Sequence, residues 1–500
     1  MLFNSYDFLF YFLPITLLLF FCSLKFFTNK ISLIVIFISS IIFYGNHNLN
    51  YLFLFIFSIL VNFYIGQRLS ILDKKSNISN LILKIGIIFN LILLFIFKYF
   101  DFFSLNLSFF NLNIPSLNLI LPIGISFYTF QQIGFLVDSY KGKSINGNLF
   151  EYATFVSFFP QLIAGPIVNH EQFIKQIKPS KYRPANYKYI STGIIIFIFG
   201  LFKKVVVADE LALRVVEPFY KLISDGDLTS APIAWISTIS YSMQIYFDFS
   251  AYSEMAIGLG LLFGITLPIN FDSPFQAKSL IDYWNRWNIT LSNFISNYVY
   301  FPLFKKLATR SKNIFNDHIR AIIIAMTITG FWHGANWNCL LFGFIHGIGL
   351  SINHFYKSKK IKLKIPSFFL RILLLVFINL TFVIFKSINL KEIKLVLYSM
   401  IPFKTNLFNS FDIFNSYFGL GNIEFILLAI LIIVTLKSPS LLKIMGYTSE
   451  NKNEIRVDSI FKKFNLSKIH SLLLSTFVTL IFFLTIILIH RGQEFIYFQF

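Results

Sequence analysis

Long apolar runs recur along the whole chain and set the strongest limit on its fold. Many of them reach 15 to 22 residues, and only 13% of the 500 residues are charged, against about 25% in a soluble protein. A run of this length can cross a bilayer as a helix, which satisfies its own backbone hydrogen bonds there. We therefore predict an all-α polytopic membrane protein with about 11–14 membrane helices and re-entrant segments.

The predicted spans follow these apolar runs. They are residues 8–24, 31–45, 50–66, 79–100, 119–137, 190–208, 231–247, 251–267, 319–333, 337–353, 366–387, 420–438 and 469–489. We expect one membrane domain over residues 1–500, with a motif-bearing core at about 119–353.

The charge pattern predicts a topology and argues against nucleic-acid binding. The net charge is +20, but the basic residues gather in short loops between apolar runs, as in the positive-inside pattern of membrane proteins. Loops 46–49, 105–118 and 225–230 carry no Lys or Arg and are predicted to face outward. The first apolar run lacks a basic segment before it, so we predict an uncleaved span with its N-terminus outside. The C-terminus is also predicted to lie outside.

Two stretches fit no simple span. Residues 152–168 join two basic clusters and contain Gly165-Pro166, which predicts a re-entrant hairpin whose break reflects backbone geometry. Residues 288–303 are amphipathic and are predicted to cross partly or to lie at the interface. Cys22 and Cys339 lie in apolar runs, so neither a disulfide framework nor a metal site is expected.

His333 is the leading candidate for chemistry. It lies in a run of 33 residues, from Ala321 to Asn353, that holds no Asp, Glu, Lys or Arg. Basic loops flank this run, and two full crossings would need roughly 40 residues. The turn after His333 is therefore predicted to lie below the outer surface, at the bottom of an outward-facing depression. An imidazole at such depth is either a functional proton carrier or a hydrogen-bonded structural group.

Other polar residues in apolar surroundings form two sets. Asn288 follows Arg286 and Trp287 in a string that also suits an interfacial belt of Trp and Arg. Residues 240–254 form a strip rich in hydroxyls and acids that lines a cavity or joins helices. The residues proposed to line a substrate tunnel come from these two sets and from the neighbour of His333; they are Arg286, Trp287, Trp332, Gln244, Tyr246, Asp248 and Ser250. His346 is expected to be a structural residue behind the site, as are Gly165 and Pro166.

These strings together resemble the membrane-bound O-acyltransferases, in particular the bacterial branch that O-acetylates cell-envelope polysaccharides. The strings that carry the resemblance are residues 4–10, 121–131, 159–167, 200–205, 246–253, 332–335 and 495–500. The resemblance implies helices around a central tunnel, with His333 as the catalytic histidine and residue 288 as its partner. That branch usually has His at this second position, where this chain has Asn288, and an amide cannot titrate.

The resemblance also implies substrates, partners and a location. No bound cofactor is expected; the donor would be acetyl-CoA or another acyl thioester, drawn to a basic rim that includes Lys305, Lys306 and Arg310. The acceptor would be peptidoglycan in first place and alginate next, reached directly or through a periplasmic partner of the SGNH-hydrolase type. The location implied is the bacterial inner membrane. A D-alanyl transferase of teichoic acid and a non-enzymatic transporter or flippase stay open as alternatives.

Overall fold

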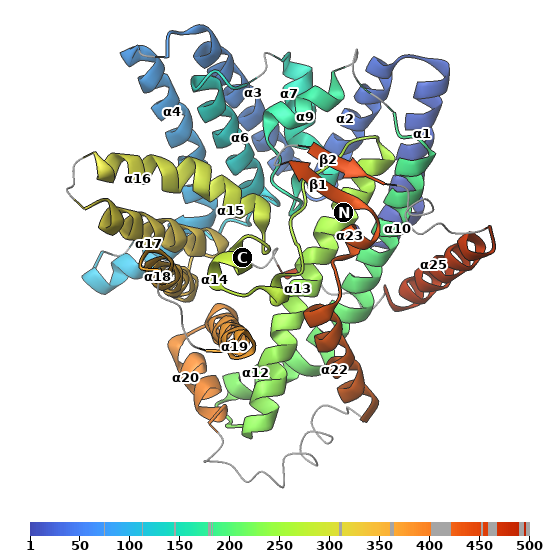
Figure 1. The fold of residues 1–500 in the computed structure, drawn as a ribbon. Coiled ribbons are helices and arrows are strands. Elements are labelled where there is room, and N and C mark those ends of the chain that lie inside the picture. Colours follow the sequence, from blue (N-terminus) through green and yellow to red (C-terminus); the bar gives the residue numbers. More distant parts are fainter. Residues whose placement is uncertain are drawn as a thin grey trace. The chain divides into compact units, whose positions relative to one another are not determined.

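The structure is a computed structural model that describes most of the chain (Figure 1). It describes residues 1–500 apart from residues 75, 113, 145–146, 179–181, 183, 310–312, 361–364, 402–421, 452–453, 459–467, 490–494 and 497–500. Arg310 and most of the terminal string 495–500 thus lie outside the described residues. Two compact units are interleaved in sequence. Unit 1 comprises residues 1–201, 252–269 and 442–481, and unit 2 comprises 202–251, 270–441 and 482–500.

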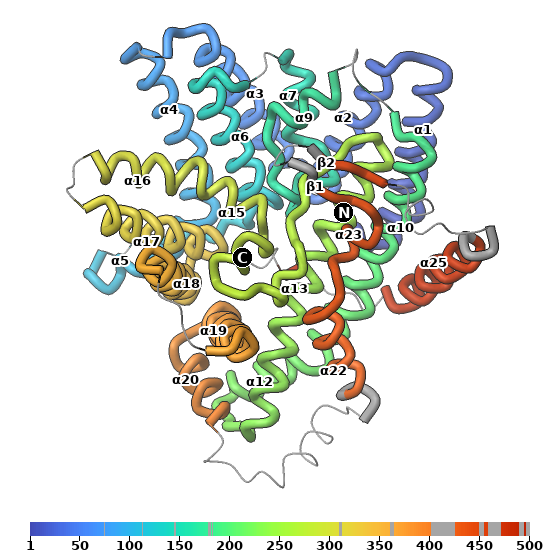
Figure 2. Tube along the Cα trace, viewed as in Figure 1, coloured from blue at the N-terminus to red at the C-terminus, as the bar shows by residue number. Residues whose placement is uncertain are grey.

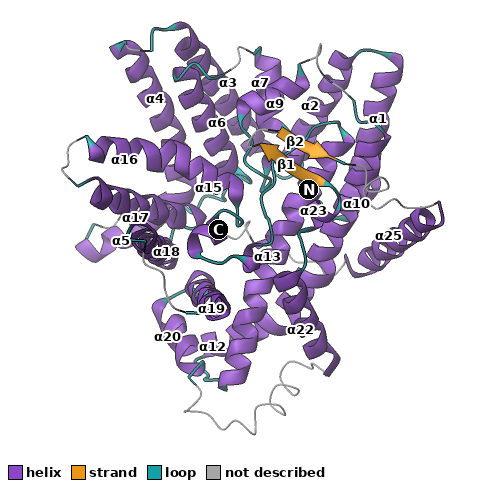
Figure 3. Ribbon diagram, viewed as in Figure 1, coloured by secondary structure: helices purple, strands orange, loops and turns teal. Residues whose placement is uncertain are grey.

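Unit 1 is built mainly from helices. They are α1 (Leu13–Phe26), α2 (Asn29–Gly45), α3 (Leu49–Ile71), α4 (Asn77–Leu94), α5 (Phe100–Leu107), α6 (Ile125–Tyr140), α7 (Leu149–Ser157), α8 (Phe159–Leu162), α9 (His170–Ile177), and most of α10 (Tyr187–Phe202), of α23 (Leu441–Ile444) and of α25 (Lys468–Leu488). Within the residues that the structure describes, one antiparallel hairpin, β1 (Tyr447–Asn451) with β2 (Glu454–Val457), is the exception to the predicted all-helical fold (Figure 3).

Unit 2 holds the remaining helices. They are α11 (Asp209–Leu211), α12 (Glu217–Asp225), the first part of α13 (Ala231–Leu262), α14 (Leu280–Trp284), α15 (Ile289–Ile295), α16 (Phe301–Ala308), α17 (Ile314–His333), α18 (Trp337–Ser358), α19 (Ser367–Lys386), α20 (Leu390–Ser399) and α22 (Asn422–Lys437). Figure 2 traces the path of the chain through α17, a short turn and α18.

Several described helices are long and apolar enough to cross a membrane. Seven qualify by length and composition: Asp7–Phe26, Leu49–Ile71, Asn77–Phe110, Tyr187–Asp225, Ile314–His333, Trp337–Ser358 and Ser367–Lys386. Three further apolar helices are shorter: Asn29–Gly45, Ile426–Lys437 and Leu472–Leu488. These helices are those of a multi-pass membrane protein. The number of 11–14 membrane helices stays a prediction.

Three predicted spans have the wrong bounds. Residues 231–247 and 251–267 were expected to be separate spans, but α13 runs unbroken through them from Ala231 to Leu262. The polar strip between them contains neither Gly nor Pro, so nothing in the backbone ends the helix there. The predicted span 119–137 also begins too early. Gly124 adopts a left-handed conformation (φ +72°) and α6 starts only at Ile125.

A buried amide network joins three helices of unit 1. Asn62 on α3 donates from Nδ2 to Gln132 Oε1 on α6 (2.7 Å) and to Asn90 Oδ1 on α4 (3.2 Å). Asn90 Nδ2 donates back to Asn62 Oδ1 (2.6 Å), and Ser58 Oγ donates to Gln132 Oε1 (2.7 Å). Between apolar helices such bonds supply the specific attraction that hydrocarbon packing lacks.

Candidate active site

Helices α17 and α18 of unit 2 lie side by side (Figure 1), and glycines on both allow their backbones to approach closely. A Cβ atom at Gly330 would lie 2.2 Å from the carbonyl oxygen of Cys339, and one at Gly343 would lie 2.3 Å from that of Met326. At Gly347 it would lie 2.9 Å from the Cα of Ile323. Larger side chains would force the two helices apart, so this small-residue face holds His333, three residues after Gly330, in a fixed position.

The turn after His333 is held by two asparagines. Asn336 caps α18 by accepting a hydrogen bond from the backbone N–H of Cys339 (2.7 Å), which is the geometry that Asn favours at helix starts. Asn338 donates a hydrogen bond from Nδ2 to the carbonyl oxygen of Ser387, just past the end of α19. The chain after His333 is therefore attached to α19.

The imidazole of His333 lies among aromatic rings. Only 5% of His333 is exposed. Its ring centroid lies 5.7 Å from that of Phe385 and 6.4 Å from that of Phe342, with interplanar angles of 83° and 82°. The indole of Trp332 lies 5.1 Å away. Such apolar walls exclude water and strengthen electrostatic interactions within the site.

Asn288 occupies a strained position on a neighbouring loop. It adopts a left-handed conformation (φ 43°, ψ 53°) at the start of α15 and is 3% exposed. Asn and His are the side chains, besides Gly, that this conformation tolerates best. Its side chain makes no hydrogen bond with any residue that the structure describes. Asn270 fixes the loop, because it accepts hydrogen bonds from the N–H of Ile289 at its carbonyl and from the Thr290 hydroxyl at Oδ1 (3.0 and 2.9 Å).

A chain of ring contacts joins the loop of Asn288 to His333. Trp287 contacts Phe382 (5.6 Å between centroids), Phe382 stacks on Phe342 (6.3 Å), and Phe342 contacts His333. Trp287 is only 4% exposed, so it belongs to the core of unit 2. The interfacial-belt interpretation of this string therefore does not fit. The two predicted catalytic residues are attached to one aromatic cluster.

His346 is a hydrogen-bonded residue of the same core. The indole N–H of Trp284 donates to its Nδ1 (3.2 Å), and its Nε2 lies 3.0 Å from Thr381 Oγ1. Because Nδ1 accepts, the ring proton must sit on Nε2 and point at Thr381. This geometry supports the structural role that we expect for His346.

Of the other predicted site residues, some contact the ring cluster and others do not. Tyr246 contacts Trp287 (6.3 Å), whereas Arg286 pairs with Asp282 (2.8 Å) at the edge of the loop. Asp248 forms an ion pair with Lys204 (2.7 Å) and accepts a hydrogen bond from the N–H of Ile496 (2.8 Å). The Oγ of Ser250 and the Oε1 of Gln244 are buried and have no hydrogen-bond partner among the described residues. Among the described residues, Asp248, Gln244 and Ser250 form no hydrogen bond, ion pair or ring contact with His333.

The Gly165-Pro166 segment lies in unit 1 and is fully buried. A Cβ atom at Gly165 would lie 2.4 Å from the Cα of Gln161, so only glycine permits this turn. Helices α7 and α8 precede it, separated at Phe158. Two short buried helices and a Gly-Pro turn agree with the geometry of the predicted re-entrant hairpin.

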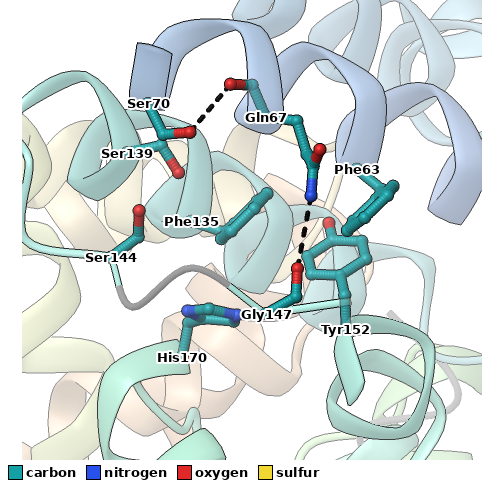
Figure 4. Close-up of a pocket in the computed structure, with 10 residues that line it drawn as sticks. Phe63, Gln67, Ser70, Phe135, Ser139, Ser144, Gly147, Tyr152 and His170 are labelled. Carbon is teal, nitrogen blue, oxygen red and sulfur yellow. Dashed lines mark hydrogen bonds between the residues drawn. The ribbon is translucent and has the colours of Figure 1, made fainter. Parts of the chain in front are cut away.

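Unit 1 also contains a small cavity, lined mainly by residues of α3, α6, α7 and α9 (Figure 4). It measures about 20 Å³, which is room for one water molecule. Figure 4 shows His170 and Tyr152 facing it together with Phe135 and Ser139. His170 is 3% exposed at the start of α9, and burial lowers its pKa from 6.5 to about 3.

The sequence matches MBOAT, the membrane-bound O-acyltransferase family, over residues 136–393. It is 39% identical over 430 residues to the peptidoglycan O-acetyltransferase of Helicobacter pylori, and the matched region covers 80% of each chain. The chain belongs to the membrane-bound O-acyltransferase family. It is therefore an acyltransferase, and the transporter alternative is set aside.

Two further members of the family are informative. The probable alginate O-acetylase AlgI of Azotobacter vinelandii is 35% identical over 358 residues, 70% of this chain and 68% of its own. The teichoic acid D-alanyltransferase of Streptococcus thermophilus is 30% identical over 241 residues, 48% of this chain and 58% of its own. The polysaccharide O-acetylating members thus match more of this chain than the D-alanyl enzyme does.

Several residues of the site were not predicted from the sequence. Phe342, Phe382 and Phe385 surround the predicted residues, but 66 phenylalanines in the chain hide any individual signal. Gly343 and Gly347 do carry a sequence signal, since small residues four apart in an apolar run are typical of a helix-packing face. Among the described residues, no group of three or more His, Cys, Asp or Glu side chains could hold a metal ion.

Proposed function

We propose that this acyltransferase moves an acetyl group from a thioester donor to a hydroxyl group of an extracytoplasmic cell-envelope polysaccharide. The observation that carries the proposal is the 39% identity to a peptidoglycan O-acetyltransferase over 80% of both chains. Peptidoglycan is the favoured acceptor, and an alginate-like polymer is next because the AlgI proteins match 70% of the chain.

In the proposed reaction, His333 is the general base. Its imidazole takes the proton of the acceptor hydroxyl while the hydroxyl oxygen attacks the acyl carbonyl carbon. A C–O bond forms, the C–S bond breaks, and the proton passes from His333 to the leaving thiolate. Proton transfer of this kind contributes about 10²–10⁴-fold to the rate. The aromatic walls support this role because they keep water from competing for the acyl group.

Asn288 has the complementary role in this proposal. Its amide cannot titrate, so it acts as a hydrogen-bond donor to the carbonyl oxygen, where negative charge develops during attack. This assignment leaves His333 as the only titratable group of the pair. Two features support it: the burial of Asn288, and the absence of a hydrogen bond from its side chain to any described residue, which leaves the amide available to a substrate.

Donor, partner and location complete the proposal. We infer acetyl-CoA as the donor, attracted to the exposed Lys305 and Lys306 on α16. The acetyl group reaches the polysaccharide directly or through a periplasmic partner of the SGNH-hydrolase type. The enzyme lies in the bacterial inner membrane with both termini outside. The D-alanyl alternative has weaker support because its relative matches 48% of the chain.

Purified enzyme in proteoliposomes tests the function. Acetyl-CoA labelled in the acetyl group is supplied with soluble peptidoglycan fragments, and free CoA and labelled glycan are both measured. We expect CoA release in proportion to glycan acetylation. Transfer of D-alanine from a carrier-protein thioester, with no transfer of acetyl, would overturn the proposal in favour of the D-alanyl alternative.

A further inference from the structure

Lys386 lies beside the aromatic cluster that holds His333. Lys386 is the last residue of α19. The residue before it, Phe385, contacts His333, and the residue after it, Ser387, accepts the hydrogen bond from Asn338. Lys386 is therefore fixed to the same stretch of backbone that supports the catalytic turn.

Aromatic faces surround the ammonium group of Lys386. Its Nζ lies 5.8 Å from the ring centroid of Tyr220 on α12 and 5.7 Å from that of Tyr241 on α13. These two rings contact each other (6.2 Å), and Tyr241 contacts Phe382 of the cluster (6.3 Å). Ring faces attract a cation but accept no ordinary hydrogen bond, so they hold the charge and leave its three N–H donors unused.

Within the described part of the chain, Lys386 forms no ion pair and donates no hydrogen bond. The carboxylates of Glu217 and Glu392 act on it only at longer range. Glu392 is occupied elsewhere, since it accepts the N–H of Ile388 (2.7 Å) at the start of α20. Lys386 is half-buried, so it attracts an anion more strongly than a fully solvated lysine does, while a small anion can still reach it.

We propose that Lys386 determines acceptor specificity by binding a carboxylate of the acceptor, so that the enzyme prefers acidic polysaccharides. This inference rests on the proposed function in its direct form, because it requires the polysaccharide hydroxyl itself to reach His333. The ammonium is a compact point charge, and it binds the acceptor in the ground state and the transition state alike. Its loss therefore raises KM for an acidic acceptor and changes kcat little.

The test uses acceptors that differ only in charge: a uronic-acid trisaccharide and its neutral methyl ester, each with acetyl-CoA as donor in proteoliposomes. Lys386→Met keeps the length of the side chain and removes its charge. We expect it to lower kcat/KM for the acid by about tenfold and for the ester by less than about twofold. Lys386→Arg should keep most of the preference. Lys391→Met, which removes an exposed lysine on α20, is the matched control and should change neither value.

Two further measurements do not depend on how well Lys386→Met folds. Glu217→Gln removes a competing exposed carboxylate and should lower KM for the acid alone. In the unmodified enzyme, 0.5 M salt should raise KM for the acid more than for the ester. Equal effects of Lys386→Met on both acceptors, or equal kcat/KM for acid and ester in the unmodified enzyme, would overturn the specificity role. Failure to acetylate either acceptor, with acetyl-CoA still consumed, would also overturn the binding of the polysaccharide at Lys386, whereas a lack of any CoA release would count against the proposed function.

Discussion

The ring of Phe385 meets the imidazole of His333 at an interplanar angle of 83°, with centroids 5.7 Å apart. Phe385 belongs to α19, so a helix outside the α17–α18 hairpin sets one wall of the site. Phe342 on α18 sets another. The orientation of the imidazole thus depends on three helices of unit 2, and substitutions on each of them should affect catalysis separately from folding.

Substitution of Phe385 should misorient the base. Phe385→Leu keeps most of the apolar volume but removes the perpendicular ring, and we expect kcat to fall about tenfold, since small displacements of a catalytic group are costly. The matched control is Phe377→Leu on the same helix, because Phe377 contacts His346 (5.3 Å) instead. Steady-state kinetics of both variants check this. Equal kcat values for the two variants would contradict it.

Three substitutions at Asn288 separate backbone strain from chemistry. Asn288→Gly removes the amide and suits the left-handed conformation, whereas Asn288→Ala removes the amide and adds about 1–2 kcal/mol of strain. We expect both to lower kcat about 10²-fold, and only the alanine variant to lower the melting temperature. Asn288→His should retain the conformation. A glycine variant with unchanged kcat would show that the amide has no chemical role.

Loss of Lys204 should destabilise unit 2. Its Nζ lies 2.7 Å from both Asp209 Oδ1 and Asp248 Oδ1, and all three side chains are at most 4% exposed. Lys204→Met leaves two buried carboxylates without a cation, which costs about 3–5 kcal/mol. Thermal unfolding in detergent measures this, with the exposed Lys221→Met as the control. Adding Asp209→Asn and Asp248→Asn to Lys204→Met should recover part of the loss. Equal melting temperatures for the two single variants would contradict the structural role.

His170 should make unit 1 less stable in acid. Burial lowers its pKa to about 3 in the folded chain, against about 6.5 when unfolded. The unfolded state therefore binds the extra proton between these values. The neutral imidazole therefore contributes fully to the free energy of unfolding above pH 6.5. This contribution decreases as the pH falls, by about 1 kcal/mol at pH 5.5. His170→Phe cannot titrate, so its melting temperature should fall less between pH 7.5 and 5.5. Parallel curves would argue against a buried neutral imidazole.

The sequence predicted the α17–α18 hairpin well because charge and length are local signals. The uncharged run from Ala321 to Asn353 has room for two helices and a tight turn, and the structure ends α17 at His333 and starts α18 at Trp337. Asn288 and Trp287 were selected through family strings, and the structure attaches their loop to the same ring cluster as His333. Their catalytic and tunnel-lining roles stay predictions.

The misplaced break in α13 has a physical cause. The polar strip around Asp248 was interpreted as a gap between spans, since a carboxylate is costly in an apolar helix. The ion pair that satisfies it comes from Lys204, 44 positions earlier in the chain, and no local pattern reveals such a partner. The same holds for Lys386, whose position over Tyr220 and Tyr241 depends on the packing of α12, α13 and α19.

The most direct test of the central claim is acetyl transfer by a His333→Gln variant that is purified and folded like the parent enzyme. Glutamine keeps hydrogen-bonding capacity but cannot accept the proton, so we predict that kcat falls by at least about 10²–10⁴-fold. His354→Gln, at a half-buried histidine near the end of α18, should leave kcat within about twofold. A His333→Gln variant that transfers acetyl at the parent rate would contradict the assignment of His333 as the base.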